Sequence, residues 1–194
     1  MARRSDHSRE ELHRLALDAA REIVREDGFE ALKARRVAER IGYTVGTLYQ
    51  VFENLDDLIE QMNVETLQAL YDQCQDVNYD QGPAESLMSL AGQFVTYFRS
   101  NSHLWSSVVF HKLPPNYVRR DTYQKTVLEL MSLIERAIDP YFSPGQETKR
   151  IHEARVLWAS VYGICALDVA SRLSSEDSLE EMVKSLIGIF VAAK

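Results

Sequence analysis

The sequence predicts an all-α protein of nine helices. Apolar side chains recur at spacings of three and four residues through most of the 194 residues, which is the period of amphipathic helices. No window alternates apolar and polar residues for long in the manner of a strand, and five prolines interrupt the helical pattern only rarely. A hydrophobic content of 45% at this length is sufficient for a buried core in one or two domains.

The first helix is expected to begin at Ser8 and to end at Gly28. Ser8 and Glu11 have the spacing of a capping box, in which a serine hydroxyl and a glutamate carboxylate satisfy backbone N–H groups of the first turn. A glycine just after the last apolar position is a common helix C-cap. Leu12, Ala16 and Ile23 are among the residues expected to face the core.

A helix-turn-helix is predicted at residues 35–52. A short helix runs into Gly42, and a second, shorter helix follows directly, which is the spacing of two helices joined by a turn of three or four residues. Four side chains are expected to pack the two helices together: Ala38, Ile41, Val45 and Leu48. Small and hydrogen-bonding side chains that face outward suit the floor of a DNA major groove, and on the second helix these are Thr44, Gly46, Thr47, Tyr49 and Gln50.

Six more helices are expected after residue 53. Asn54 can cap a long fourth helix that frays around residues 76–82, and Pro83 is well placed as the first residue of the fifth. The other helices are expected at about 103–112, 116–138 and 147–173, and from Ser178 onward. Helices eight and nine carry more apolar surface than one small domain covers, so we expect a homodimer in which both helices of each chain form a four-helix bundle.

The net charge of −7 is distributed unevenly along the chain. Residues 1–55 contain ten Lys/Arg and ten Asp/Glu, so the whole excess of negative charge lies in the remainder. The cations of the first part concentrate at 33–40 and near the start of the sequence, where Arg3 and Arg4 form either a flexible arm along the duplex or a disordered tail. A locally basic face still neutralises phosphates because salt confines each charge to about 8–10 Å.

Neither a metal site nor an enzyme is expected from the motifs. Cys74 and Cys165 lie far apart without a CxxC or Cys/His cluster, which disfavours a disulfide framework, a zinc site or another metal or cofactor centre. No nucleophile–base pair, paired carboxylates or phosphate-binding loop is visible, so no catalytic residue is proposed. The absence of a signal peptide and of a long apolar run favours a cytoplasmic protein with no membrane partner.

The sequence resembles the TetR family of transcriptional repressors. The resemblance is carried by Ala19-Ala20, Gly28-Phe29, Val37-Ala38, Gly42, Gly46-Thr47-Leu48-Tyr49, Phe52 and Leu58. In the second half, Leu104-Trp105 and residues 158–164 resemble the C-terminal domain of a TetR branch named for a Trp, a His and a Gly, with Tyr162 where that branch usually has His. The family implies a nine-helix architecture with a helix-turn-helix DNA-binding domain, here residues 1–53, and a ligand-binding and dimerisation domain, here residues 54–194.

The resemblance implies DNA contacts by both helices of the helix-turn-helix. Arg35 would reach a base edge or a phosphate, and Arg36 a phosphate. The full candidate set is Arg35, Arg36, Thr44, Val45, Gly46, Thr47, Tyr49 and Gln50. The chain departs from the family at Lys33, which replaces a threonine that often caps the second helix, and at Leu55, which replaces a lysine that commonly contacts phosphate.

A ligand pocket is expected in the second domain. Aromatic and amphipathic side chains on converging helices suit an apolar cavity with a few polar points. The candidates are Trp105, Val109, Phe110, His111, Tyr123, Trp158, Tyr162, Cys165 and Asp168. Asp168 would pair with a ligand or with an arginine across an interface, for which Arg155 is a candidate.

These features favour a ligand-responsive dimeric repressor. It would bind a palindromic operator in double-stranded DNA and leave it when a small-molecule effector binds. One alternative is a dimeric helical scaffold with weakened DNA recognition, which the departures at Lys33 and Leu55 suggest. The other is an all-helical enzyme, which no motif in the sequence supports.

Overall fold

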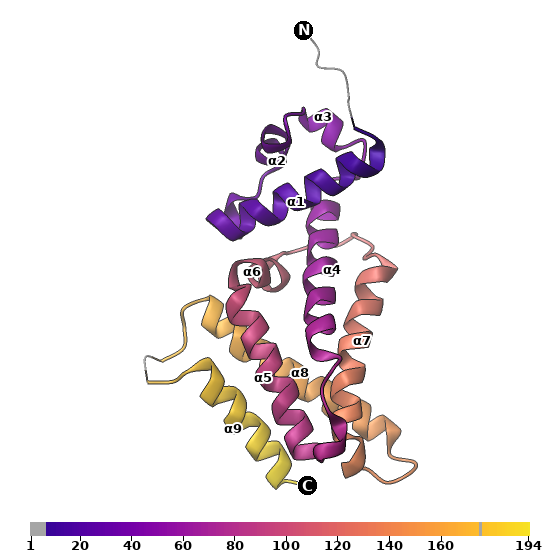
Figure 1. The fold of residues 1–194 in the computed structure, drawn as a ribbon, viewed down its shortest axis with the longest axis vertical. Coiled ribbons are helices and arrows are strands. Elements are labelled where there is room, and N and C mark those ends of the chain that lie inside the picture. Colours follow the sequence, from indigo (N-terminus) through magenta and orange to yellow (C-terminus); the bar gives the residue numbers. More distant parts are fainter. Residues whose placement is uncertain (1–6, 175) are drawn as a thin grey trace. The chain divides into compact units, whose positions relative to one another are not determined.

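The computed structural model describes residues 7–174 and 176–194. Within these ranges it contains nine α-helices, three short 3-10 segments and no strand, which confirms the predicted fold class. The helices are shown in Figure 1 and have these bounds: α1 Arg9–Asp27, α2 Ala34–Ile41, α3 Val45–Leu48, α4 Leu55–Cys74, α5 Pro83–Ser100, α6 Ser102–Phe110, α7 Asp121–Ile138, α8 Glu147–Val169 and α9 Leu179–Ala192. Arg3 and Arg4 lie outside the described residues.

Four helices start at the residues that the sequence predicts for their first turns. Ser8 and Glu11 form both hydrogen bonds of the capping box at α1, and Asn54 Oδ1 accepts from the Asp57 N–H at 2.9 Å as α4 begins. Pro83 is the first residue of α5, and the Ser178 hydroxyl accepts from the Glu181 N–H at α9. The polar residues before each apolar stripe therefore fix where these helices start.

Two helix boundaries differ from the predicted ones. The helix expected from residue 116 begins at Asp121, because Tyr117 and the Arg120 backbone N–H are engaged with Glu60 of α4 instead. The helix expected to reach residue 173 ends at Val169. Ser171 there has a φ of 53°, and a left-handed residue of this kind ends an α-helix.

The chain forms two compact units. The first unit consists of the described residues up to Thr66 together with His103–Tyr123, and the second consists of Leu67–Ser102 and Gln124–Lys194. Helix α4 is continuous through the boundary, with Leu55–Thr66 in the first unit and Leu67–Cys74 in the second. The division into functional domains at residues 53 and 54 concerns binding and stays a prediction.

The first unit is built on the apolar face of α1. Ala16, Ala20 and Ile23 have no exposed surface, and they form one cluster with side chains from the helix-turn-helix and from the first half of α4. Leu48 and Phe52, which flank the exposed end of α3, are 0% and 2% exposed. Burial of each such side chain contributes about 1.5–3 kcal/mol, so α3 is held firmly although it is only four residues long.

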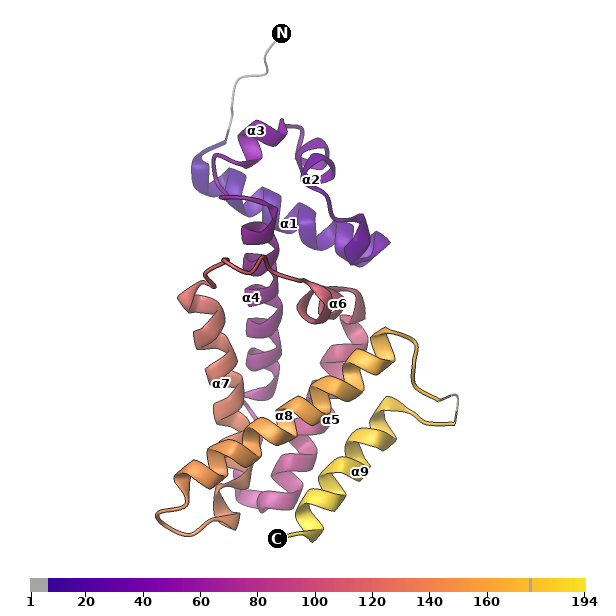
Figure 2. The ribbon, with the colours of Figure 1, turned by 180° about the vertical axis from the view of Figure 1, so that it is seen from behind.

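The second unit packs α5 against α9, and α9 against α8. Figure 2 shows α8 crossing α5 with α9 alongside. Leu87, Leu90 and Phe94 of α5 are buried, as are Val183 and Ile187 of α9. Helix α8 is different, because only Ala154, Leu157 and Cys165 of its 23 residues are buried. Apolar side chains of α8 therefore remain at the surface of the single chain.

Candidate DNA interface and effector cavity

The turn between α2 and α3 depends on Gly42. Gly42 has φ 76° and ψ 25°, a left-handed conformation that glycine adopts without steric cost. Its own N–H donates to the Glu39 carbonyl oxygen, and the Tyr43 N–H donates to the Ala38 carbonyl oxygen at 2.9 Å. These bonds satisfy the last carbonyls of α2 and turn the chain sharply, so that α3 can start three residues later.

Thr44 is the N-cap of α3. Its hydroxyl accepts from the Thr47 N–H at 3.2 Å and lies 2.9 Å from the Thr47 hydroxyl. No comparable cap exists at α2, where Lys33 makes no side-chain hydrogen bond to the first turn. The predicted loss of the α2 cap at Lys33 is therefore observed. Helix α2 starts instead with the Val37 N–H donating to the Lys33 carbonyl oxygen.

The polar residues expected to face outward on α3 are accessible. Thr44, Gly46, Tyr49 and Gln50 are exposed and Thr47 is half-buried, whereas Leu48 between them is fully buried. Tyr49 exposes 43% of its surface, so part of this side chain is open to solvent. Val45 is half-buried. The surface left open is one of hydroxyl, amide and backbone groups, which suits contact with base edges and phosphates.

The guanidinium groups on α2 are accessible but paired with carboxylates. The Arg35 side chain is 85% exposed and donates to Glu39 at 2.8 Å, and the hydrogen bond to Glu39 raises the pKa of Arg35. Arg36 pairs with Asp27, and Arg40 pairs with Glu26 at 2.5 Å. Exposed pairs of this type contribute little stability, so a phosphate can replace the carboxylate at small cost.

A hollow of about 470 Å³ adjoins α3 in the first unit. His7 Nδ1 and the Tyr43 hydroxyl are hydrogen-bonded across it at 2.7 Å, and Thr47 and Gln50 lie on its wall. His7, Arg9 and Tyr43, which also line this hollow, are not among the residues that the sequence predicts to contact DNA. An aromatic hydroxyl inside the turn of a helix-turn-helix is the signal that could have identified Tyr43.

Acidic residues of α4 bind the segment that follows α6 within the first unit. Asp57 and Glu60 are 2% and 1% exposed. Arg120 Nε donates to Asp57 Oδ1 at 2.7 Å, and the Tyr117 hydroxyl donates to Glu60 Oε2 at 2.9 Å. Burial, together with the neighbouring Glu60, raises the pKa of Tyr117. Buried carboxylates need such partners, so these contacts fasten residues 117–120 to the first two turns of α4.

The candidate ligand residues are divided between the two units. Five of them belong to the first unit: Trp105, Val109, Phe110, His111 and Tyr123. Trp105 is fully buried, and His111 Nε2 lies 2.8 Å from Asp56 Oδ1 with its ring edge-on to Phe29. Phe110 is 43% exposed. Four more belong to α8 in the second unit: Trp158, Tyr162, Cys165 and Asp168.

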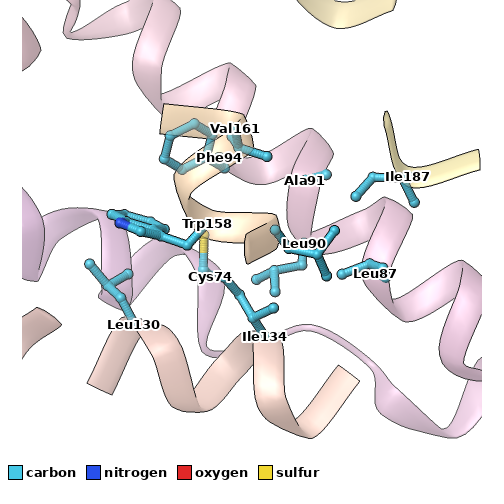
Figure 3. Close-up of a pocket in the computed structure, with 11 residues that line it drawn as sticks. Cys74, Leu87, Leu90, Ala91, Phe94, Leu130, Ile134, Trp158, Val161 and Ile187 are labelled. Carbon is cyan, nitrogen blue, oxygen red and sulfur yellow. The ribbon is translucent and has the colours of Figure 1, made fainter. Parts of the chain in front are cut away.

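A cavity of about 50 Å³ lies inside the second unit. Figure 3 shows the apolar side chains that surround it, and Trp158 is the member of the candidate ligand set among them. The Trp158 ring lies edge-on to Phe94, with the ring centroids 5.9 Å apart. The other lining residues are Cys74, Leu87, Leu90, Ala91, Phe94, Leu130, Ile134, Leu157, Val161 and Ile187. Their spacing marks them as core residues, and sequence alone does not distinguish a packed core from one with a cavity.

Both cysteines are buried thiols. Burial raises the pKa of Cys74 to about 11, and burial, with a smaller contribution from Asp168, raises the pKa of Cys165 to about 12. Asp168 itself is half-buried and Arg155 is exposed. They are 13 residues apart on α8, which is roughly 20 Å along a helix axis, so they do not pair within one chain.

The described residues were also searched for groups that could bind a metal ion and for helices that could span a membrane. Residues 7–174 and 176–194 contain no group of three His, Cys, Asp or Glu side chains arranged to hold a metal ion. Over the same residues, none of the helices combines the length and apolar character needed to cross a membrane. What the geometry offers is a polar surface on α3 and an apolar cavity in the second unit.

Comparison with known proteins agrees with this geometry. Residues 16–62 match the model of bacterial regulatory proteins of the tetR family. Residues 87–190, more than half of the chain, match the model of the tetracyclin repressor-like C-terminal domain. The comparison with curated protein sequences gives no significant match.

Solved structures with the same fold include three regulators. A TetR transcriptional regulator from Rhodococcus sp. RHA1 has a TM-score of 0.70 and 16% identity, with 93% of this chain and 95% of that chain covered. Thermus thermophilus FadR, a TetR-family transcriptional repressor in complex with lauroyl-CoA, has a TM-score of 0.69 and 16% identity, with 92% and 93% covered. The fatty acid degradation regulator FadR from Bacillus halodurans has a TM-score of 0.68 and 16% identity, with 94% and 99% covered.

The capped helix α3 on a three-helix core, followed by a helical body, matches the architecture of a helix-turn-helix transcriptional regulator that binds DNA. The chain belongs to the tetR family of bacterial regulatory proteins. This is a family of transcriptional regulators and not of enzymes. The narrower branch suggested by Trp158 and Gly163 stays a prediction.

Proposed function

We propose that the protein is a dimeric repressor that leaves a palindromic operator when a small molecule binds. The observation that carries the proposal is the orientation of α3. Leu48 anchors the helix in the core while Thr44, Gly46 and Gln50 face outward. A helix held in this way can enter a major groove without unfolding any part of the first unit.

The DNA contacts follow from the exposed groups. The Thr47 and Gln50 side chains would meet base edges, and the exposed N–H groups at the start of α3 would hold a phosphate beside Thr44. Arg35 and Arg36 would exchange Glu39 and Asp27 for the DNA backbone, and the Tyr49 hydroxyl would reach a phosphate. Val45 and Gly46 would allow the backbone of α3 to approach the groove closely.

The dimer would form through α8 and α9. Val156 and Leu167 on α8 and Ile189 on α9 are 49%, 43% and 71% exposed in the single chain, and a four-helix bundle with a second copy would cover them. A two-fold axis would then present two α3 helices to successive major grooves, about 34–36 Å apart. Such an arrangement requires an operator whose half-sites are related by the same symmetry. A cytoplasmic location follows if the operator is chromosomal.

The effector would bind in the second unit, at the cavity beside Trp158 and Phe94. The complex of Thermus thermophilus FadR with lauroyl-CoA supports a small-molecule site in a protein of this fold. Binding of the effector would then lower the affinity for DNA, and binding of DNA would lower the affinity for the effector by the same factor, with a coupling free energy of about 1–3 kcal/mol. Residues 1–53 would bind DNA, and residues 54–194 would bind the effector and the second chain.

Selection of bound duplexes from a random pool tests the proposal directly. We expect an inverted repeat to be enriched, and we expect the selected duplex to bind as a complex of two chains. Recovery of sequences without a shared motif would contradict sequence-specific repression.

A helical scaffold with weakened DNA recognition is the second candidate. Two observations favour it: α2 lacks a side-chain cap at Lys33, and Leu55 is half-buried against the core of the first unit instead of offering a charge. Combined substitution of Arg35→Ala and Tyr49→Phe separates the two candidates. Operator affinity that survives both changes would favour the scaffold, and a clear loss of affinity favours the repressor.

A further inference from the structure

We propose that the second unit contains a binding site for an organic ammonium group, and that Lys194 occupies this site within the chain itself. The site consists of Phe142, Glu153 and Phe190, and we call it the ammonium site. None of these residues lines the cavity beside Trp158, so the ammonium site is distinct from the one proposed for the effector. Its binding chemistry is also independent of DNA binding and of repression.

Three segments of the second unit form the ammonium site. Phe190 lies near the end of α9, Glu153 lies on α8, and Phe142 directly follows the 3-10 segment Asp139–Tyr141. The Tyr141 ring lies edge-on to Phe190 with the ring centroids 6.2 Å apart, which places this segment against α9. All three residues of the ammonium site are half-buried, so packing limits the movement of their side chains.

The contacts of Lys194 show which chemistry suits the site. Lys194 Nζ lies 4.5 Å from the centroid of the Phe142 ring and 4.7 Å from that of Phe190. Both distances are within the roughly 6 Å over which an aromatic face attracts a cation. The same Nζ donates a hydrogen bond to Glu153 Oε2. The Lys194 side chain is only 13% exposed, so its charge is largely removed from water, where cation–π attraction is stronger than at the surface.

This arrangement favours an ammonium group over other ligand groups. An anion would be repelled by the Glu153 carboxylate and by the negative faces of the two rings. A neutral alcohol would lose water without gaining an ion pair or a cation–π contact. A planar guanidinium stacks on one ring, whereas a compact ammonium ion can lie against two aromatic faces and a carboxylate together. The ligand class is therefore a primary or quaternary organic ammonium.

Lys194 is the chain's own competitor for such a ligand. Phe190 and Lys194 are four residues apart, which is the spacing of neighbours on one helix face. The Lys194 N–H donates to the Val191 carbonyl oxygen at 3.1 Å, so the backbone holds this side chain beside the Phe190 ring. A tethered group has a high effective concentration at its site. An external ammonium must displace Lys194, and displacement would detach the end of α9 from Phe142 and Glu153.

Removal of the Lys194 side chain, with its amine supplied from solution, tests the site. Lys194→Ala vacates the site in the full chain, and n-butylammonium has the same four-carbon stem and head group as the lost side chain. Binding is measured by NMR titration of the Phe142 and Phe190 backbone amide signals. We expect saturable binding of n-butylammonium to the variant and about tenfold weaker binding to the wild type, in which Lys194 competes. The variant should bind n-butanol roughly tenfold more weakly than n-butylammonium.

Two further variants separate the ammonium site from a general effect of losing a lysine. Lys149→Ala is the matched control, because Lys149 Nζ also lies near Glu153, at 3.9 Å from Oε1, but its side chain is 63% exposed. We expect this variant to bind n-butylammonium no better than the wild type. Glu153→Gln, added to Lys194→Ala, should weaken n-butylammonium roughly tenfold and leave n-butanol unchanged, because only the cation uses the carboxylate charge.

The outcomes decide the ammonium site without reference to repression. If Lys194→Ala does not fold, Lys194→Gln takes its place, because it also removes the charge. Lack of saturable binding to the folded variant, or equal affinity for n-butylammonium and n-butanol, would overturn the site. These titrations contain no DNA, and operator selection contains no amine, so failure of one proposal leaves the other standing.

Discussion

Replacing Arg120 by alanine should destabilise the first unit measurably. The Arg120 guanidinium donates to Asp57 Oδ1 from Nε at 2.7 Å and from Nη2 at 2.5 Å. The Asp57 side chain is only 2% exposed, whereas the Arg120 side chain is 43% exposed. The substitution therefore removes the cationic partner of a carboxylate that stays buried.

The expected cost lies between two limits. Removal of one partner from a fully buried ion pair costs about 3–5 kcal/mol, and exposed pairs contribute no more than about 1 kcal/mol. Asp57 keeps hydrogen bonds from the Gln61 side chain and from the Glu53 N–H, both at 3.0 Å. We therefore expect a loss of about 2 kcal/mol, which corresponds to a decrease in Tm of roughly 4–8 °C for a chain of this size.

A double-mutant cycle with Asp57→Ala isolates the pair from other effects of each substitution. Urea denaturation of the wild type, both single variants and the double variant gives the coupling free energy, which we expect to be about 1–2 kcal/mol. Lys125→Ala is the matched control, because its contact with Glu129 is a 3.7 Å pair on an exposed helix face and should cost less than about 0.5 kcal/mol. A coupling below about 0.3 kcal/mol would refute the role assigned to this contact.

Three further predictions concern the recognition helix, the start of α4 and the buried thiols. Thr44→Ala should lower the free energy of unfolding by about 1 kcal/mol and weaken operator binding. Ser178→Ala, which removes the equivalent cap of α9, should lower stability without weakening operator binding. Urea denaturation measures the first effect and titration with DNA the second. Leu55→Lys adds a cation at the first residue of α4, so the plot of log affinity against log salt concentration should steepen by about one. An unchanged slope would exclude a phosphate contact there. Burial raises the pKa of Cys74 to about 11 and that of Cys165 to about 12, against 9.0 for the unfolded thiols. The unfolded chain therefore loses these two protons at lower pH than the folded chain does. The free energy of unfolding should consequently fall as the pH rises above about 9. The Cys74→Ala, Cys165→Ala double variant should lack that part of the decrease in urea midpoints measured from pH 8 to 11.

Local signals were sufficient to predict most of the fold. Ser8, Thr44 and Ser178 mark helix starts because each side chain accepts a hydrogen bond from the backbone N–H three residues later. Gly42 marks the turn because its left-handed φ is costly for other residues. These effects act over a few residues, so they can be recognised without knowledge of tertiary structure.

The misplaced start of α7 has a tertiary cause. Residues 116–120 carry a helical pattern, but Tyr117 and Arg120 bind carboxylates about 60 residues earlier in the chain. Such contacts outweigh a weak local preference for helix. The end of α8 at Val169 was missed for a local reason, because a serine with positive φ gives no sequence signal comparable to glycine.

The candidate DNA surface was more predictable than the ligand site. Alternation of buried Leu48 with exposed Thr44 and Gln50 follows from helical periodicity. The aromatic residues that the sequence predicts for a pocket are divided between two units, and His111 is hydrogen-bonded to Asp56. The cavity exists because core side chains from five helices do not fill the space between them completely. The spacing of residues in the sequence does not predict where such a gap forms.

The specificity ratio of the protein for its operator tests the central claim most directly. This ratio is the affinity for the selected palindrome divided by the affinity for an unrelated duplex of equal length, both measured by fluorescence anisotropy at one salt concentration. If α3 reads base edges, the Thr47→Ala, Gln50→Ala variant should lose at least tenfold in this ratio while its Tm and its binding to unrelated DNA change little. A variant that keeps the wild-type ratio would contradict recognition of DNA by α3.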